Sequence, residues 1–262
     1  MKKEIRIFFT ALMFYTRIPC PTYADHSDDY LNKATRYFPF IGWIVGALSF
    51  GAFYLVNLFL GLELAVIASL MVGVLTTGAF HEDGLADVFD GFGGGWTKER
   101  ILEIMKDSRI GAYGVIALIL QFAVKYTALN KISTLLLPEN LIILFLIFIS
   151  YHALARLTAI NISFISNYSR ADESSKSKPI AKSNTYKEVL GAYIGGLLPL
   201  MALCYFNWLF LVVLIPLLIV VIYANYYFNK WIDGYTGDCL GAAEQIAECV
   251  ALFSFIVIWT FS

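Results

Sequence analysis

Long apolar stretches recur along almost the whole chain, and they restrict its fold more than any other feature. The 262 residues are 59% hydrophobic and 15% charged, whereas soluble domains usually carry about 25% charged residues. A helix needs about 20 residues to cross a bilayer, and seven runs meet that length. We therefore predict an all-α polytopic membrane bundle of about seven transmembrane helices. The expected spans are 37–60, 62–80, 110–129, 140–165, 188–206, 208–229 and 239–261.

Two further helices are expected outside the spans. Residues 1–36 are basic and amphipathic, and no small-residue cleavage site follows their apolar part. We interpret this part as a retained interfacial or re-entrant helix rather than a cleaved signal. Residues 98–107 have one apolar side, which predicts a short amphipathic helix after the acidic motif described below. No soluble domain or internal repeat is evident, so residues 1–262 are predicted to form a single membrane-embedded domain.

Small side chains in the spans are expected to serve packing rather than chemistry. Gly42 and Gly46 are four residues apart in the first span, which is the spacing that lets a second helix approach closely in a membrane. The four cysteines show no CxxC pairing. We interpret them as free thiols or small core residues and expect no disulfide framework.

The distribution of positive charge predicts how the chain is oriented. Sixteen of the nineteen lysines and arginines fall in segments that seven spans would place on one side of the membrane. Those segments are 1–36, 81–109, 166–187 and 230–238. The positive-inside rule puts them in the cytoplasm and the C-terminus outside. The net charge of −1 and the lack of a basic run give no indication of a nucleic-acid partner.

The most unusual polar stretch is residues 81–95, which places four carboxylates within nine residues directly after an apolar run. Asp83, Asp87 and Asp90 are spaced i, i+4 and i+7, so on a helix they share one face. Oxygen ligands in such a pattern suit a hard cation such as Mg²⁺ or Mn²⁺. Glu82 points elsewhere and is the weakest of the four ligand candidates. The alternative is a solvated helix end with aspartates at capping positions. Gly93 and Gly94 allow a ligand to approach the backbone closely.

Other polar groups are predicted to lie on the same side as the acidic motif. They are Lys106, Asp107 and Arg109, and Asp238 at the entrance to the last span. We expect one cytoplasm-facing polar cavity in which acidic groups hold metal and basic groups hold phosphate.

Arg156 and Glu248 lie within predicted spans, where a charge is costly and usually has a partner or a function. A structural ion pair between them is the alternative to a role at the site. His152 is interpreted as a packed or hydrogen-bonded histidine, whereas His81 adjoins the motif and stays ambiguous.

Two functional classes are compatible with these residues. The first is a metal-dependent transferase acting on a phosphorylated substrate at the membrane face. The second is a divalent-cation or small-molecule transporter, which would place its acids at the bilayer midplane and often has repeated halves. The acids here lie mainly at span ends on one side, which favours the enzyme.

Several motifs give the chain a family resemblance. They are Thr16-Arg17-Ile18-Pro19, Tyr37-Phe38-Pro39-Phe40-Ile41-Gly42, His81-Glu82-Asp83-Gly84-Leu85-Ala86-Asp87, Asp90-Gly91, residues 100–111 and Thr236-Gly237-Asp238-Cys239-Leu240-Gly241-Ala242-Ala243. In this order, the motifs resemble the cobalamin synthase (adenosylcobinamide-GDP ribazoletransferase) family across nearly the whole chain. Position 82 is often apolar in that family, whereas Glu248 matches a recurring carboxylate. CDP-alcohol phosphotransferases share the chemical logic but not the motif, because no Ala-Arg follows Asp83-Gly84.

The resemblance implies an enzyme of the inner membrane with its active site facing the cytoplasm. It would join adenosylcobinamide-GDP to α-ribazole, or its 5′-phosphate, with Mg²⁺ as cofactor and GMP as the released product. Homo-oligomerisation or association with other cobalamin-assembly enzymes is a further expectation. The metal ligands would be Asp83, Asp87, Asp90 and Glu82. The catalytic candidates are Asp107, Asp238, Arg109 and Lys106, and the substrate-binding candidates are Arg17, Arg109, Arg156, Gly93 and Gly94.

Overall fold

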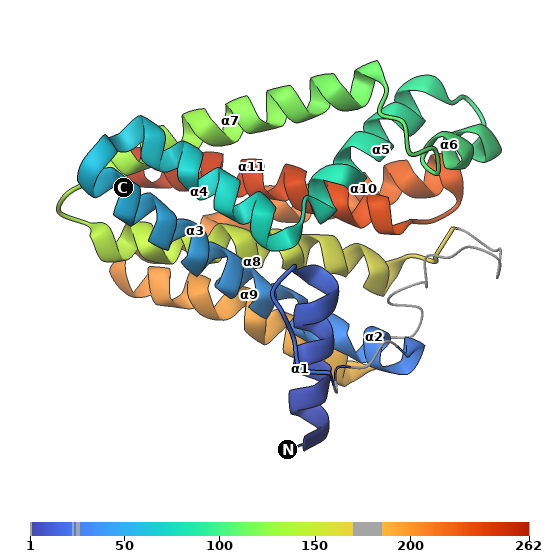
Figure 1. The fold of residues 1–262 in the computed structure, drawn as a ribbon, viewed down its shortest axis with the longest axis horizontal. Coiled ribbons are helices and arrows are strands. Elements are labelled where there is room, and N and C mark those ends of the chain that lie inside the picture. Colours follow the sequence, from blue (N-terminus) through green and yellow to red (C-terminus); the bar gives the residue numbers. More distant parts are fainter. Residues whose placement is uncertain (1, 23, 25–26, 170–184, 262) are drawn as a thin grey trace.

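The computed structural model describes residues 2–22, 24, 27–169 and 185–261. The helices in these ranges form a bundle whose long members run side by side (Figure 1). Its elements are α1 (Lys2–Tyr15), α2 (Asp28–Ala34), η1 (Thr35–Tyr37), α3 (Phe38–Leu60), α4 (Leu62–Thr77), α5 (Phe80–Gly94), α6 (Lys98–Ile104), α7 (Ala112–Leu136), α8 (Leu141–Ile165), α9 (Tyr186–Phe206), η2 (Trp208–Val213), α10 (Leu214–Ile232) and α11 (Gly237–Phe261).

Two helices form the centre of the bundle. In α8 and α11, 72% and 61% of the most apolar 18-residue window is buried, compared with 22–33% in the other candidate spans. The peripheral helices keep apolar side chains on their outer faces, as a bilayer requires. The chain is therefore a multi-pass helical membrane protein, which confirms the predicted fold class.

The predicted second span is not a straight helix. Among the described residues, six helices are long and apolar enough to cross a membrane. The pair of α4 and α5, bent by 88° at its break, makes a seventh if the two together count as one span. Gly78 and Ala79 separate the two helices in left-handed conformations, with φ of 69° and 59°. The apolar pattern continues through this break to Phe80, and for that reason the sequence predicted an unbroken span over 62–80.

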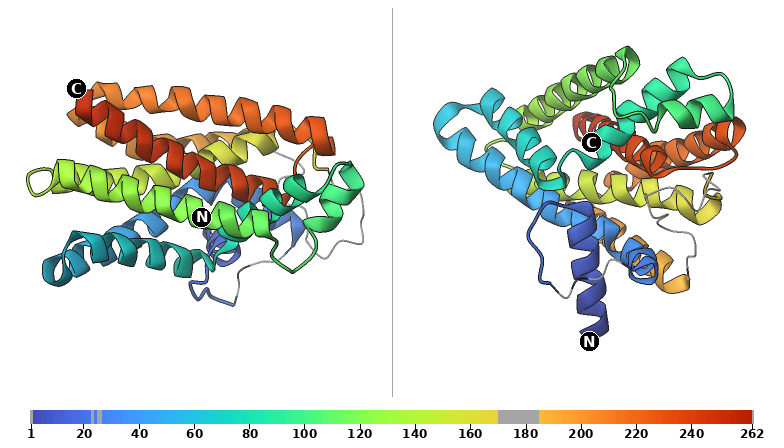
Figure 2. Two further views of the ribbon diagram at one scale, coloured as in Figure 1. Left: turned by 90° about the horizontal axis from the view of Figure 1, so that it is seen from above. Right: turned by 45° about the vertical axis from the view of Figure 1, so that its right-hand side comes forward.

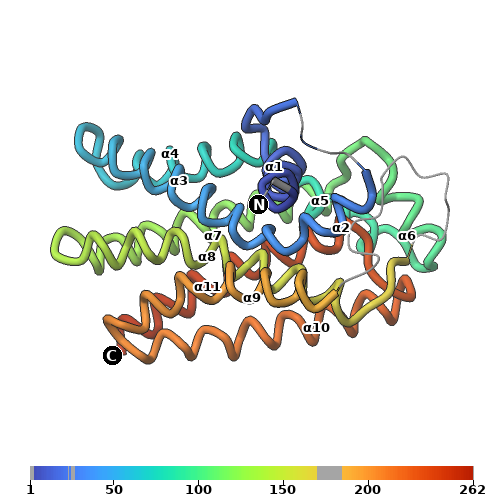
Figure 3. Tube along the Cα trace, turned by 90° about the horizontal axis from the view of Figure 1, so that it is seen from below, coloured from blue at the N-terminus to red at the C-terminus, as the bar shows by residue number. Residues whose placement is uncertain are grey.

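Helix α1 lies across the bundle instead of along it (Figure 3), the arrangement expected of a helix at a membrane interface. Its buried side includes Ile7, Ala11 and Tyr15. The short helix predicted over 98–107 is also present as α6, although it ends at Ile104.

Two of the segments that the charge pattern assigned to one side, 81–109 and 230–238, meet at one end of the bundle, where α5 and α6 lie beside the end of α10 and the start of α11 (Figure 2). Residues just after α8 pair with those before α11, since the N–H of Ser169 donates to the carbonyl of Tyr235 at 2.8 Å. Lys98 forms an ion pair with Asp233 at 3.0 Å. Four basic residues of the predicted 166–187 loop lie outside the described residues, namely Arg170, Lys176, Lys178 and Lys182.

The predicted small-residue face packs against the central helix. A Cβ at Gly46 would lie 2.6 Å from the carbonyl oxygen of Phe148, and one at Gly42 would lie 2.7 Å from that of His152. Gly46→Ala is therefore expected to lower the free energy of unfolding by about 1–3 kcal/mol, because the backbones of α3 and α8 must separate. Thermal unfolding in detergent measures this.

Gly51→Ala is the matched control in the same helix, because a Cβ there meets nothing within 4 Å. It should leave stability unchanged or raise it by up to about 1 kcal/mol through helix propensity. Equal destabilisation by both changes would contradict close α3–α8 packing.

Candidate active site

Close packing between α5 and α11 brings two separate motifs together. A Cβ on Gly84 would lie 2.9 Å from the carbonyl oxygen of Asp238, and one on Gly241 would lie 3.1 Å from that of His81. The glycines therefore allow the two backbones to touch. The backbone of Asp238, at the start of α11, therefore lies against Gly84 of the acidic helix. The shared site itself stays a prediction.

The three aspartates of α5 have different surroundings. Asp83 is exposed and Asp87 is half-buried. Asp90 accepts hydrogen bonds from the backbone N–H groups of Gly111 at 2.6 Å and Gly114 at 2.9 Å. It thus caps the first turn of α7, whose N–H groups lack partners within the helix. Asp90 therefore has a capping role, as in the alternative interpretation of the motif, although the helix that it caps is α7. The two N–H groups stabilise its negative charge without a metal ion.

The loop after α6 places the predicted basic groups beside this region. The side chain of Arg109 donates three hydrogen bonds to Asp107, from Nε to both carboxylate oxygens and from Nη2 to Oδ2 at 2.6 Å. This hydrogen-bonded guanidinium lowers the pKa of Asp107 to about 2. Lys106 and Arg109 are exposed, so both can reach a solvent-borne phosphate. The N–H of Gly111 ties the end of the loop to Asp90.

The remaining predicted binding residues serve packing as well. A Cβ on Gly93 would lie 2.6 Å from the ring of Tyr113, so this glycine accommodates an aromatic side chain of the protein. Gly94 is exposed beside Ile104. The exposed side chain of Arg17 lies over Gly78, at the break between α4 and α5. Of these three residues, Arg17 and Gly94 are exposed and could contact a ligand.

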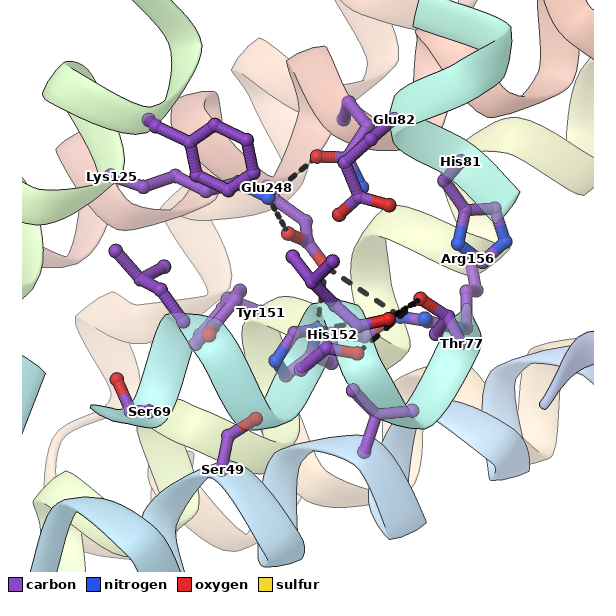
Figure 4. Close-up of a pocket in the computed structure, with 16 residues that line it drawn as sticks. Ser49, Ser69, Thr77, His81, Glu82, Lys125, Tyr151, His152, Arg156 and Glu248 are labelled. Atoms are coloured by element: carbon purple, nitrogen blue, oxygen red, sulfur yellow. Dashed lines mark hydrogen bonds and ion pairs between the residues drawn. The ribbon is translucent and has the colours of Figure 1, made fainter. Parts of the chain in front are cut away.

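A second polar group lies inside the bundle, below the acidic helix. It surrounds a cavity of about 20 Å³, which is room for about one water molecule (Figure 4). The cavity is lined by side chains from α3, α4, α5, α7, α8 and α11. The charged or imidazole-bearing ones are His81, Glu82, Lys125, His152, Arg156 and Glu248.

Ion pairs connect this interior group. Arg156, 1% exposed, lies 2.8 Å from Glu244 and 3.6 Å from Glu248. Nδ1 of His152 is 2.5 Å from Oε1 of Glu248, and Lys125 forms an ion pair with the other oxygen of Glu248. Arg156 was predicted to bind substrate, but it is enclosed and paired, which matches the structural alternative. The hydrogen-bonded His152 is as predicted.

Glu82 belongs to the interior group and not to the outer acidic face. Its side chain is 8% exposed and points into the cavity (Figure 4). Because adjacent helical residues differ by about 100° in direction, Glu82 cannot share the face of Asp83. The structure therefore gives no support to Glu82 as a fourth ligand on the outer face.

A metal ion requires ligand atoms that converge on one point. Among the described residues, the group of three acidic or histidine side chains whose ligand atoms lie within 4.8 Å of one another is His152, Glu244 and Glu248. Its two carboxylates already pair with Lys125 and Arg156, so internal cations take the place of a metal there. Metal ligation stays a prediction for Asp83, Asp87, Asp90 and Glu82.

The sequence analysis missed the partners of the interior group. Lys125 and Glu244 are not among the residues that the sequence analysis singles out. The available signal was that spans 110–129, 140–165 and 239–261 each carry at least one charged residue between their ends. Charges at similar depth in a bilayer tend to pair. Which ones pair depends on how each helix is rotated, and the pattern of one span does not encode that rotation.

The fold and this arrangement define a polytopic membrane protein with an acidic helix and basic loops at one end. A family model described as cobalamin-5-phosphate synthase matches residues 7–256. The chain belongs to this family. A relative from Shewanella baltica and one from Shewanella oneidensis, both named adenosylcobinamide-GDP ribazoletransferase, are each 42% identical over 259 residues, covering 98% of this chain and 95% of the relative. No solved structure matches.

Replacing Asp90 separates its capping role from a metal role. Asp90→Ala is expected to lower the free energy of unfolding by about 0.5–2 kcal/mol, because two N–H groups of α7 lose their acceptor. Hydrogen exchange should become faster at residues 111–115. Asp29→Ala, which removes an exposed helical pair with Lys33, should change stability by less than about 0.5 kcal/mol. Unchanged exchange in Asp90→Ala would contradict the capping role.

Proposed function

We propose that the chain is an Mg²⁺-dependent transferase that joins adenosylcobinamide-GDP to α-ribazole or its 5′-phosphate and releases GMP. The observation that carries the proposal is the meeting of Asp238 with the acidic helix at Gly84, within a chain that matches the family over residues 7–256. The names of the relatives supply the substrates. We further propose that this end of the bundle faces the cytoplasm at the inner membrane, since Lys98, Lys106, Arg109 and Lys230 belong to the segments that meet there.

The residues present fit a magnesium ion. Asp83 and Asp87 lie one turn apart on α5, and Asp238 begins the helix packed against it. Mg²⁺ typically takes one or two carboxylates and completes its shell with water and phosphate oxygens. When bound, the ion would neutralise the diphosphate and orient it. We propose Asp87 and Asp238 as its ligands, with Asp83 as an outer ligand. In the described residues the ligand atoms of these three do not all lie within 4.8 Å of one another.

The reaction exchanges one phosphorus–oxygen bond for another. A ribose hydroxyl oxygen of ribazole attacks the phosphorus on the cobinamide side, the bond to the GMP phosphate breaks, and GMP leaves. Lys106 and Arg109 are exposed at the loop and would offset the negative charge on the leaving phosphate. The hydroxyl proton passes to a carboxylate.

With one oxygen of Asp238 bound to the metal, its other oxygen suits the role of proton acceptor better than Asp107. A pKa of about 2 makes Asp107 a weak base at neutral pH. The hydroxyl of Thr236 lies 3.3 Å from Oδ2 of Asp238 and can orient it. Asp107 then acts by holding Arg109 in place.

The proposal is tested with purified protein in liposomes supplied with adenosylcobinamide-GDP and α-ribazole. Asp87→Asn is expected to reduce GMP release at limiting Mg²⁺ by about 100-fold or more, because a ligand charge is lost. Excess Mg²⁺ should restore part of the rate. Glu103→Gln, which removes an exposed acid paired with Arg100 on α6, is the control and should retain full activity. A magnesium-independent reaction in the wild type would refute the metal role, and ion flux without product would favour a transporter.

The pH dependence tests the role of Asp107. Because its folded-state pKa is lowered to about 2, Asp107 remains ionised throughout any practical assay range. Asp107→Asn is therefore expected to lower the rate of GMP release without moving the acid limb of the pH–rate profile. The stabilisation from its pairing with Arg109 would be lost only as pH falls toward 2. An acid limb that shifts or vanishes in Asp107→Asn would identify Asp107 as the titrating base instead.

A further inference from the structure

Lys125 is an ammonium group enclosed within a membrane-spanning helix. Its residue is 3% exposed, its amino group donates to Oε1 of Gln245 at 2.6 Å, and it forms an ion pair with Glu248. Both partners belong to α11. Because a charge in this environment is costly, its presence calls for a specific role.

The same amino group faces the acidic helix. Glu82 of α5 lines the same cavity (Figure 4) and interacts electrostatically with Lys125. Lys125 therefore lies between α11, which begins with Asp238, and α5, which carries Asp83 and Asp87. Its own helix, α7, is also attached to α5 through Asp90 at the N-terminal end. α7 thus holds both helices that carry the proposed ligands.

Direct contact between Lys125 and a substrate is not available. The cavity of about 20 Å³ admits about one water molecule, far less than a nucleotide or corrinoid requires. Any effect of Lys125 on the reaction must therefore pass through α5 and α11. A displacement of about 1 Å in a group that positions reactants can lower a rate by about 100-fold.

We propose that Lys125 is a positioning residue that fixes α11 against α5, so that Asp238 and Asp87 present their carboxylates to one magnesium ion. This inference rests on the proposed function. Loss of the lysine charge leaves Glu248 with one partner fewer and removes the polar contacts that Lys125 makes with α11, while the hydrogen bond from Gln121 of α7 to Gln245 remains. The first consequence is weaker magnesium binding, since α5 and α11, which carry the proposed ligands, are no longer held in a fixed position relative to each other.

The test compares Lys125→Met, Lys125→Arg and the double change Lys125→Met/Glu248→Gln with the wild type. Lys131→Met is the matched control, because Lys131 is exposed on the same helix. The Mg²⁺ concentration for half-maximal GMP release and the unfolding temperature in detergent are measured for each. Lys125→Met should raise the half-maximal Mg²⁺ concentration at least tenfold. Lys125→Arg, which keeps the charge, should return it to within threefold of the wild type.

The double change separates positioning from charge compensation. Removing the lysine and glutamate charges together leaves neither partner of that pair ionised in the interior, so the unfolding temperature should recover toward that of the wild type. The raised Mg²⁺ requirement should remain, because the contacts of Lys125 with α11 are still absent. The double change also keeps the test open if Lys125→Met fails to fold.

Two results would overturn the inference. One is a wild-type Mg²⁺ requirement in Lys125→Met, and the other is full recovery of that requirement in the double change, which would make Lys125 a compensating charge only. If the wild type itself released GMP without needing Mg²⁺, the proposed function would fail instead. The Mg²⁺ dependence of the wild type thus distinguishes failure of the proposed function from failure of the inference about Lys125.

Discussion

The arrangement of this protein depends on charges that cannot be left unpaired in a membrane. Lys125 and Arg156 lie in the interior with Glu244 and Glu248, and each cation has a carboxylate partner. Removing one partner from such a group is far more costly than removing both, because the remaining charge has no solvent to stabilise it. The pairs therefore specify which faces of α7, α8 and α11 must meet. Apolar contacts alone would discriminate poorly, since lipid is as apolar as the helix surfaces.

Close backbone contacts set the distances that these charges require. Gly42 and Gly46 let α3 touch α8, and Gly84 with Gly241 lets α5 touch α11. A side chain at any of these positions would separate the helices. The interior ion pairs and the surface aspartates are consequently linked, because α11 carries Glu244 and Glu248 in its middle and Asp238 in its first turn.

The acidic helix has two faces with different tasks. Its inner face contributes His81 and Glu82 to the cavity, whereas Asp83 is exposed and Asp87 half-buried on the outer side. The 88° bend before it turns this helix away from the direction of α4, so one face can contact the interior group while the other remains accessible. The bend depends on left-handed conformations at Gly78 and Ala79; only the first is a residue that adopts them at no steric cost.

The amino-acid sequence by itself determined the membrane class, the approximate spans, the short helix near residue 98 and the family, because each follows from local hydrophobicity, spacing or motif order. It also indicated that Asp238 and the acidic motif lie at one end. Only the tertiary structure decided that Asp90 caps α7, that Glu82 points inward and that Arg156 pairs with Glu244. Those outcomes depend on how each helix is rotated against its neighbours. Side chains from distant segments fix that rotation, and the periodicity of a single span does not contain it.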